Sequence, residues 1–240
     1  MSDLGGTVEL LDTGEVEVLG LLPYSSNYVF LTRVTSEGKE AHAVYKPTRG
    51  ERPLWDFPTG TLAAREVAAF MLSEAAGWGL VPPTVLRPDA PLGAGSLQLF
   101  IEHDPERHCF VLAEERLDDL RPFAAFDAVI NNADRKGGHV IEDADGRLWG
   151  VDHGLSFNVD TKLRTVLWAF AGERLDVALK AHLQCLRDRM QQPDGVGSQL
   201  ARLLSRAELA AALKRLEELL RSGRFPEPDP NQHHLPWPLL

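Results

Sequence analysis

Two short stretches of the chain place aspartate and histidine at a spacing that suits phosphoryl transfer. The first, residues 131–139, is a polar loop that contains Asp134 and His139, and the second, residues 151–157, has Asp152 at a strand end. A base and metal-binding carboxylates must share one small volume to move a phosphoryl group. Either aspartate alone is better explained as an ordinary turn residue, because Asp is a common turn former. The two stretches together favour a catalytic site.

A predicted β-hairpin brings these stretches together. Residues 139–142 alternate in polarity, residues 143–146 form a turn, and residues 147–151 run back. Antiparallel pairing across this turn places His139 close to Asp152, and the preceding loop holds its own aspartate over the same point.

The bulk composition is that of a folded protein large enough for one sizeable core. Of the 240 residues, 44% are hydrophobic, and the formal charge is -10. This charge argues against a nucleic-acid partner and against global attraction to an anionic membrane. Local basic pairs, Lys162 with Arg164 and Arg187 with Arg189, are exceptions. The first residues do not form a signal peptide and no apolar run spans a membrane, so we expect a cytoplasmic protein without stable membrane insertion.

Short alternating runs broken by turn residues predict a small antiparallel sheet in the N-terminal part of the chain. After an irregular, proline-rich segment over 47–60, the pattern predicts a helix over 61–76, with Thr61 as N-cap and Gly77 as C-cap. The predicted strands are 7–10, 15–21, 28–34, 41–46, 83–86 and 96–102.

The C-terminal part is predicted to be mostly helical. A helix over 120–130 presents its phenylalanines on one face and leads directly into the polar loop. Two further helices are predicted over 173–190 and 205–223, the second opening with a capping box. The tail over 225–240 contains five prolines, which favours an extended or irregular path.

Lys46 ends a predicted strand, from which its ammonium could reach nucleotide phosphates or simply solvent. Glu66 lies on the apolar face of the following helix, where an unpaired carboxylate would be costly. Lys46 is its natural partner, as in the lysine–glutamate ion pair of kinases. The alternative is a shifted helix boundary that lets Glu66 reach the rim.

Two other segments could contribute to a nucleotide site. Ser25, Ser26 and Asn27 lie in a turn between two predicted strands, where backbone amides could cradle phosphate, although no glycine-rich motif is present. The apolar strand over 96–102 could form a wall for adenine or simply a core strand.

Five ordered motifs resemble those of phosphatidylinositol 3- and 4-kinases, and the chain is most similar to the type II phosphatidylinositol 4-kinases and their small bacterial relatives. The resemblance spans about residues 25–170. It implies an α+β, two-lobed protein-kinase-like fold, with an antiparallel sheet and one helix in an N-lobe over about 1–102. A mostly helical C-lobe would cover about 103–224. The motifs are residues 44–47, 65–70, 95–102, 132–135 and 151–157.

The resemblance also implies how ATP would be held. Lys46 would contact the phosphates and Glu66 would orient that lysine. The segment containing Gln98, Phe100 and Ile101 would meet adenine.

On the catalytic side, the resemblance implies ATP-dependent transfer of the γ-phosphoryl group to a hydroxyl acceptor. Asp134 would lie against that hydroxyl, and Asp152 would hold Mg²⁺ or Mn²⁺. Lys136 matches the catalytic-loop lysine of serine/threonine kinases and would stabilise charge on the phosphoryl group. The acceptor could be an inositol-type polyol, a lipid or a protein side chain.

His139 is the main departure from these kinases, which usually have asparagine as a metal ligand there. Imidazole suits Mg²⁺ poorly. Three interpretations follow: the second metal is absent, or it is a softer ion that His139 binds, or the protein is a pseudokinase that binds nucleotide and acts through partners. AMP transfer with ATP bound in reverse is a further possibility. The segment over 47–60 lacks the cysteines of the type II enzymes, so lipid contact, if any, would be peripheral.

Overall fold

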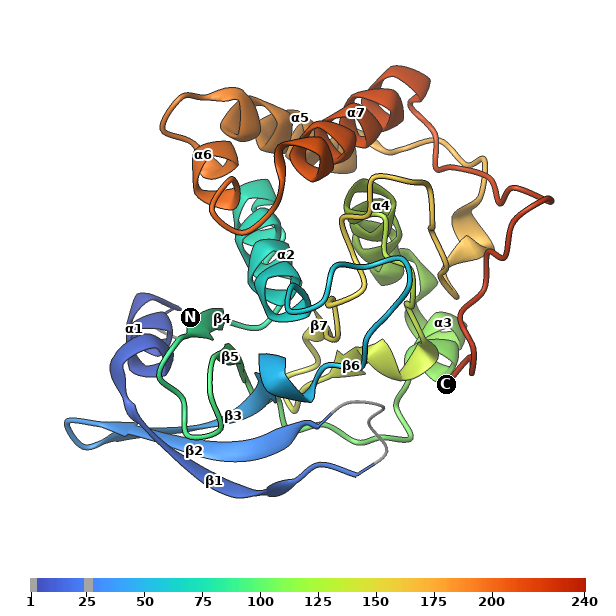
Figure 1. Cartoon of the computed structure of the whole chain (residues 1–240). Coiled ribbons are helices and arrows are strands. Elements are labelled where there is room, and N and C mark those ends of the chain that lie inside the picture. The colour runs from blue at the N-terminus through green and yellow to red at the C-terminus, as the bar shows by residue number, and fades with distance from the viewer. Residues whose placement is uncertain (1–3, 24–27) are drawn as a thin grey trace.

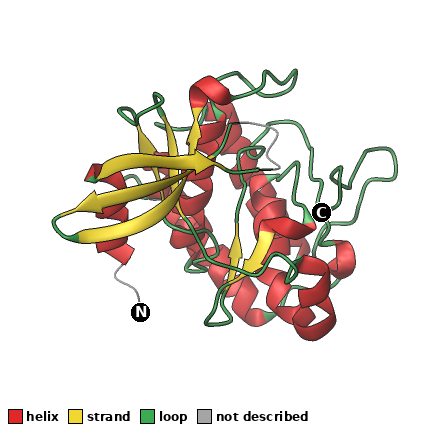
Figure 2. Cartoon of the chain, turned by 90° about the horizontal axis from the view of Figure 1, so that it is seen from below, coloured by secondary structure: helices red, strands yellow, loops and turns green. Residues whose placement is uncertain are grey.

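The computed structural model describes residues 4–23 and 28–240, which form two lobes. Figure 1 shows a twisted sheet at one end of the molecule and a mostly helical body at the other. Seen from below in Figure 2, the strands of the larger sheet gather on one side and most helices on the other. The predicted two-lobed α+β arrangement, with an antiparallel sheet in one lobe and a mostly helical second lobe, is therefore confirmed.

The N-lobe is built on a five-stranded antiparallel sheet with the strand order β1-β2-β3-β5-β4. Alternate residues of its strands, among them Val34, Ala43 and Leu97, are buried in a small hydrophobic core of the N-lobe. Glu37 and Gly38 join β2 to β3 with positive φ angles of 49° and 80°, as a tight hairpin turn requires. The strands are β1 (Glu15–Leu21), β2 (Phe30–Ser36), β3 (Lys39–Pro47), β4 (Thr84–Arg87) and β5 (Gly95–Leu99).

Residues 7–10, predicted as a strand, instead belong to helix α1 (Leu4–Thr13). The strand prediction was wrong because a pattern of only four residues fits the period of a helix as well as that of a strand. Leu11, the next residue, distinguishes the two. Leu10 and Leu11 are both buried in the N-lobe core, whereas neighbouring residues of a strand would point to opposite faces. Helix α1 packs beside β4 (Figure 1).

Helix α2 (Leu62–Ala76) lies between the sheet and the C-lobe, and residues on nearly all of its faces are buried. Gly77 ends it in the left-handed conformation, as predicted. Thr61, however, does not cap it: its backbone is helical and its side chain bonds elsewhere. The carboxylate of Glu51 accepts the Leu62 amide at 3.1 Å instead, so the cap comes from the preceding segment.

The C-lobe is mostly helical, and its core is continuous with the inner face of α2. The predicted helix over 173–190 begins later because the side chain of Asp176 accepts the Leu179 amide at 2.7 Å and caps it there. The capping box at Ser205 is present as predicted. The helices are α3 (Cys109–Arg116), α4 (Arg121–Ile130), α5 (Val177–Gln191), α6 (Val196–Leu200) and α7 (Arg206–Ser222).

Strands β6 (Val140–Glu142) and β7 (Leu148–Gly150) form the predicted hairpin. Its pairing continues past the strands, since the Val151 amide donates to the His139 carbonyl at 3.0 Å. The hairpin therefore holds the residue before β6 opposite the residue after β7, as expected.

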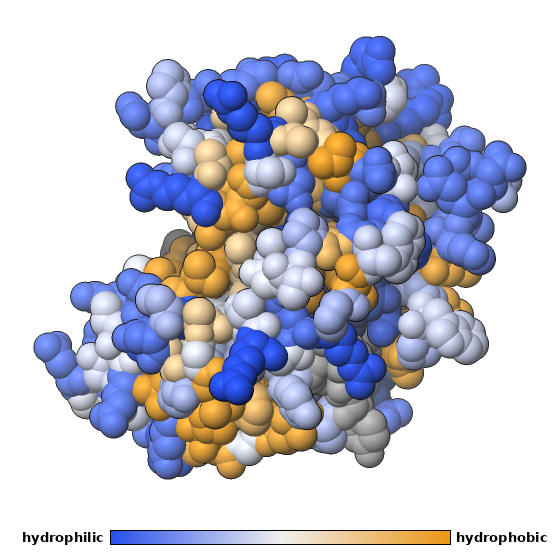
Figure 3. Space-filling view, in the orientation of Figure 1, coloured by the Kyte–Doolittle hydropathy of each residue, from blue (hydrophilic) through white to orange (hydrophobic). Residues whose placement is uncertain are grey.

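The tail over 225–240 contains no helix or strand, in agreement with its proline content. It runs along the C-lobe and reaches the polar loop, where the Gly137 amide donates to the Leu239 carbonyl at 2.7 Å. Figure 3 shows hydrophilic side chains over most of the helical lobe on this face and apolar ones near the junction of the lobes. Among the described residues, no helix has both the length and the apolar character needed to cross a bilayer.

Two glycines of the sheet give a matched test of this fold. A Cβ at Gly95 would lie 2.8 Å from the Cα of Pro47 and against the Lys46 carbonyl, whereas a Cβ at Gly20 would meet nothing within 4 Å. We expect Gly95→Ala to lower the free energy of unfolding by about 1–3 kcal/mol through overpacking. Gly20→Ala should leave it unchanged or slightly higher. Urea unfolding measures both; equal effects would contradict the close approach of β5 to β3.

Candidate active site

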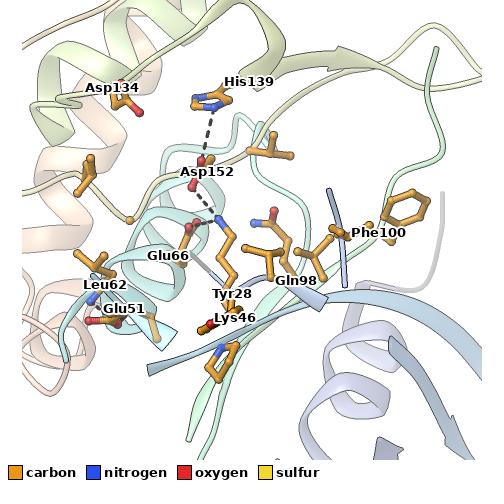
Figure 4. A pocket seen from close by; sticks show the side chains of 18 of the residues that line it. Tyr28, Lys46, Glu51, Leu62, Glu66, Gln98, Phe100, Asp134, His139 and Asp152 are labelled. Carbon is orange, nitrogen blue, oxygen red and sulfur yellow. Dashed lines mark hydrogen bonds and ion pairs between the residues drawn. The ribbon is translucent and has the colours of Figure 1, made fainter. Parts of the chain in front are cut away.

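A cavity of about 610 Å³ lies between the two lobes. Its walls come from the N-lobe sheet, helix α2, the segment after β5 and the two polar loops of the C-lobe. This volume is typical of small-molecule and cofactor sites. Figure 4 shows the polar side chains of the cavity converging from both lobes.

At the centre of the cavity, one lysine joins two carboxylates. Lys46 Nζ lies 2.5 Å from Glu66 Oε1 and 2.7 Å from Asp152 Oδ1 (Figure 4). Lys46 comes from β3, Glu66 from α2 and Asp152 from the turn after β7, so three elements meet here. The Glu66 side chain is only 3% exposed, which explains why it needs a partner. The ion pair expected between Lys46 and Glu66 is thus present.

The charges of these three groups support one another. Burial alone would lower the pKa of Lys46, but the adjacent Asp152 and Glu66 carboxylates raise it above its ordinary value. The Lys46 charge holds the pKa of Asp152 well below its usual range. Burial raises the pKa of Glu66, although Lys46 opposes this shift and the His153 amide donates to Glu66 at 2.9 Å. Lys46 and Asp152 therefore remain charged at neutral pH.

Asp152 is placed by an uncommon backbone conformation. Its φ of 59° is left-handed, a region that Asp tolerates better than most residues. Its side chain is 52% exposed and lines the cavity. This geometry leaves a charged carboxylate available to a ligand.

Asp134 faces the same cavity from the loop after α4 (Figure 4). Its backbone amide donates to the Asn132 side chain at 3.0 Å, which fixes the turn. Lys136 Nζ lies 3.3 Å from Asp134 Oδ2. Burial nevertheless raises the pKa of Asp134 to about 6, with Lys136 opposing the shift. This carboxyl group can therefore take up and release a proton near neutral pH.

His139 lies between the two loops, with Nε2 3.4 Å from Asp152 Oδ2. Its Nδ1 accepts the Lys136 amide at 3.4 Å, so the ring proton belongs on Nε2, toward Asp152. Burial lowers the pKa of His139 to about 4. The imidazole is therefore neutral at physiological pH.

Beneath the loops lies a buried ion pair that the sequence analysis missed. Asp127 and Arg135 have no exposed surface, and the Arg135 guanidinium lies 2.9 Å from Asp127 Oδ1. Arg135 also donates to the carbonyls of His139 and Val151, at 3.1 and 3.0 Å. The sequence pattern could have indicated this pair, because Asp127 lies on the apolar face of its helix, where a carboxylate needs a partner.

Arg65 is a second missed residue, fully buried beside Glu66. Its guanidinium donates to the Ser156 carbonyl at 2.6 Å, pairs with Glu208 of α7 and lies 5.0 Å from the centre of the Phe57 ring. It therefore fastens α2 to the loop after Asp152 and to the C-lobe.

The remaining predicted residues have mixed outcomes. Gln98, Phe100 and Ile101 line the cavity, although the Gln98 amide group donates to Thr84 at 2.9 Å. Ser25, Ser26 and Asn27 lie outside the described residues.

Comparison with known proteins gives one relative of high similarity and several structures of the same fold. No protein-family model matches the chain. The protein Rv2133c of Mycobacterium tuberculosis is 39% identical over 265 aligned residues, which cover 95% of this chain and 94% of Rv2133c. A structure of hydra Fam20 with sugar has a TM-score of 0.63 at 17% identity, covering 92% of this chain and 88% of its own.

Two further structures agree on the fold. The Golgi casein kinase with Mn/ADP bound has a TM-score of 0.57 at 16% identity, with 91% of this chain and 75% of its own covered. The Helicobacter pylori proinflammatory kinase CtkA has a TM-score of 0.50 at 9% identity, with 90% and 94% covered. These structures establish the kinase-like fold.

The Lys46–Glu66 pair should be measurable as stability. Lys46→Met would leave Glu66 buried without its partner, so we expect unfolding to become easier by about 3 kcal/mol. The double variant Lys46→Met/Glu66→Leu should recover most of this loss. Lys39→Met, on the exposed end of the same strand, should have an effect within about 0.5 kcal/mol. If the single and double variants are equally destabilised in urea unfolding, the buried pair is not the cause.

Proposed function

The chain belongs to the family of the Mycobacterium tuberculosis protein Rv2133c, and we propose that it is an ATP-dependent phosphotransferase that moves the γ-phosphoryl group to an alcohol. One observation carries the proposal: Lys46, paired with Glu66, shares a cavity with two aspartates in distinct electrostatic states. Asp152 is held ionised, whereas Asp134 titrates near neutral pH. Phosphoryl transfer needs both kinds of carboxylate.

Each residue has a role in this reaction. Lys46 holds the ATP phosphates, and Glu66 keeps its ammonium in place. Asp134 takes the proton of the acceptor hydroxyl as the acceptor oxygen bonds to the γ-phosphorus. The bond from that phosphorus to the oxygen bridging it to the β-phosphate breaks, and ADP leaves with the electron pair. Lys136, beside Asp134, stabilises negative charge on the transferring group.

The cavity also suits a nucleotide-bound Mg²⁺ or Mn²⁺, because Asp152 presents an ionised oxygen ligand there. Within residues 4–23 and 28–240, no three His, Cys, Asp or Glu side chains converge to hold a metal by themselves, so ATP phosphates and water would complete the shell. The metal would neutralise phosphate charge. In the hydrogen-bonding arrangement described above, His139 donates toward Asp152 and orients it; ligation through Nε2 needs the other tautomer.

Within this reaction class, we assign the chain to the phosphatidylinositol 3-/4-kinase-like type, on the order of its motifs. The hydroxyl acceptor would then be an inositol-type polyol or lipid, or a protein side chain. The Golgi casein kinase structure, with its Mn/ADP, supports nucleotide and divalent metal use in this fold.

Labelled ATP tests the reaction directly. With γ-labelled ATP and Mg²⁺ or Mn²⁺, label should reach an acceptor; with α-labelled ATP it should not. Asp134→Asn should lower kcat by about 10²–10⁴-fold because the base is lost, and Asp152→Asn should abolish metal-dependent turnover. Asp145→Asn, in the exposed β6–β7 turn, is the matched control and should match the wild type. Transfer of α-label would indicate AMP transfer instead, and an unchanged Asp152→Asn rate would exclude its role.

The pKa of Asp134 predicts the pH dependence. As a base, Asp134 acts in its ionised form, so kcat/KM should rise with pH, reach half its plateau near pH 6 and stay level above that. Lys136→Met removes a positive charge that lowers this pKa, so the midpoint should move to higher pH. If the pH midpoint of kcat/KM is the same in Lys136→Met as in the wild type, Asp134 is not the base.

A further inference from the structure

Residues 234–240, the tail segment, lie against the polar loop of residues 131–139, which is the catalytic loop of the proposed reaction. The Gly137 amide of this loop donates to the Leu239 carbonyl at 2.7 Å. Figure 1 shows the end of the tail beside α3. The tail segment is therefore attached to the catalytic loop itself.

A second contact attaches the tail segment to the part of the chain that pairs with this loop. The His234 carbonyl accepts the Thr165 amide at 3.1 Å and the Trp168 indole N–H at 2.8 Å. Thr165 in turn forms a parallel β-bridge with Arg135 of the catalytic loop. The tail segment thus spans two paired pieces of the chain and holds both.

Gly137 is closely packed where the tail segment meets it. The residue is buried. A Cβ there would lie 2.8 Å from the Phe110 ring and 3.1 Å from Leu240 Cδ1, whereas a Cβ at Gly138 would meet nothing within 4 Å. Phe110 of α3 and Leu240 of the tail segment therefore both pack on the backbone of one residue, directly after Lys136.

The inner and outer sides of the catalytic loop are held with different strength. On the core side, the buried Asp127–Arg135 pair and the Ala133 amide, which donates to the Leu155 carbonyl at 2.8 Å, fix the part before Lys136. Breaking such a pair strands a buried charge. On the outer side, the backbone hydrogen bond to the tail segment adds little net stability, because water can replace it.

The tail segment itself buries little apolar surface. Of residues 234–240, all of them described, only Pro236 is buried. Trp237 is 89% exposed, and the three leucines of the segment are exposed as well. Segments with little buried apolar surface open locally at low free-energy cost. The tail segment can therefore leave the catalytic loop while the C-lobe core stays folded.

We propose that the tail segment positions the catalytic loop for phosphoryl transfer, so that its release slows transfer and leaves ATP binding intact. The inference rests on the proposed function and adds a means of regulating that site. Gly137 follows Lys136, whose ammonium lies beside Asp134, so a shift of the backbone here misplaces the group that stabilises the transferring phosphoryl. None of the described residues 234–240 lines the cavity that would hold ATP.

A charge at the one buried residue of the tail segment tests the proposal in the whole chain. Pro236→Asp should release the segment, because a buried carboxylate without a partner is costly. We expect kcat to fall about tenfold or more and KM for ATP to change less than about twofold. Trp237→Asp puts the same charge on an exposed neighbour, and Pro236→Ala stays apolar, so both should keep the wild-type kcat. Turnover is measured as ADP formed from ATP and Mg²⁺, with inositol or water alone as the acceptor.

Amide hydrogen exchange measures the tail contact without any catalysis. In Pro236→Asp, the Gly137 and Thr165 amides lose their acceptors in the tail segment and should exchange at least about tenfold faster. The Ala133 amide keeps its acceptor in the core and should keep its rate. Trp168→Phe removes only the indole donor and should accelerate Thr165 exchange less. Calorimetry with a non-hydrolysable ATP analogue should give one Kd for all variants, and thermal unfolding should show that they are folded.

The outcomes separate this inference from the proposed function. Faster exchange in Pro236→Asp, with no turnover in any variant or in the wild type, would overturn the proposed function and leave the attachment of loop to tail standing. A wild-type kcat in Pro236→Asp despite faster exchange, or an equal loss in Trp237→Asp, would overturn the inference and leave the function standing.

Trp168→Phe keeps the test decisive if Pro236→Asp does not fold. Its kcat should fall about threefold through one lost hydrogen bond, with KM for ATP unchanged. Gly137 exchange that stays as slow as in the wild type in both variants would show that the tail segment does not hold the loop, and would overturn the inference.

Discussion

The site depends on one buried ion pair, Asp127 with Arg135. Asp127 lies on the inner face of α4 and Arg135 follows Asp134, so the pair fastens the catalytic loop to the C-lobe core. The same guanidinium donates to the carbonyls of His139 and Val151 and to the His153 ring. Val151 and His153 are the residues on either side of Asp152. A buried pair is costly to break, because removing one partner strands the other charge, at about 3–5 kcal/mol. Arg135 thus positions the loops of both Asp134 and Asp152, although it does not itself line the cavity.

Local patterns predicted the parts of the fold that they alone control. The hairpin around residues 143–146, the Ser205 capping box and the stop at Gly77 each depend on a few adjacent residues, and each is present. The lysine–glutamate pair was also predictable, because a carboxylate on an apolar helix face requires a nearby cation. In each of these cases, the types of a few residues determine the local structure directly.

The misses have the opposite character, since each depended on a distant partner. Residues 7–10 became helical because Leu10 and Leu11 both face the N-lobe core. The N-terminus of α2 is capped by Glu51 rather than Thr61 because the preceding segment folds back over it. Arg65 contacts Ser156 and Glu208, residues far away in the sequence. No local pattern contains such information.

The position of α2 has a consequence for control of the enzyme proposed here. The N-lobe sheet, the C-lobe helices and the Arg65 contacts hold this helix from several sides and keep Glu66 beside Lys46. Swinging α2 outward would expose apolar surface and strand two buried charges. Displacing this helix would therefore cost free energy. In the proposed enzyme, any control that works by moving α2 would have to overcome that cost before it could separate Glu66 from Lys46.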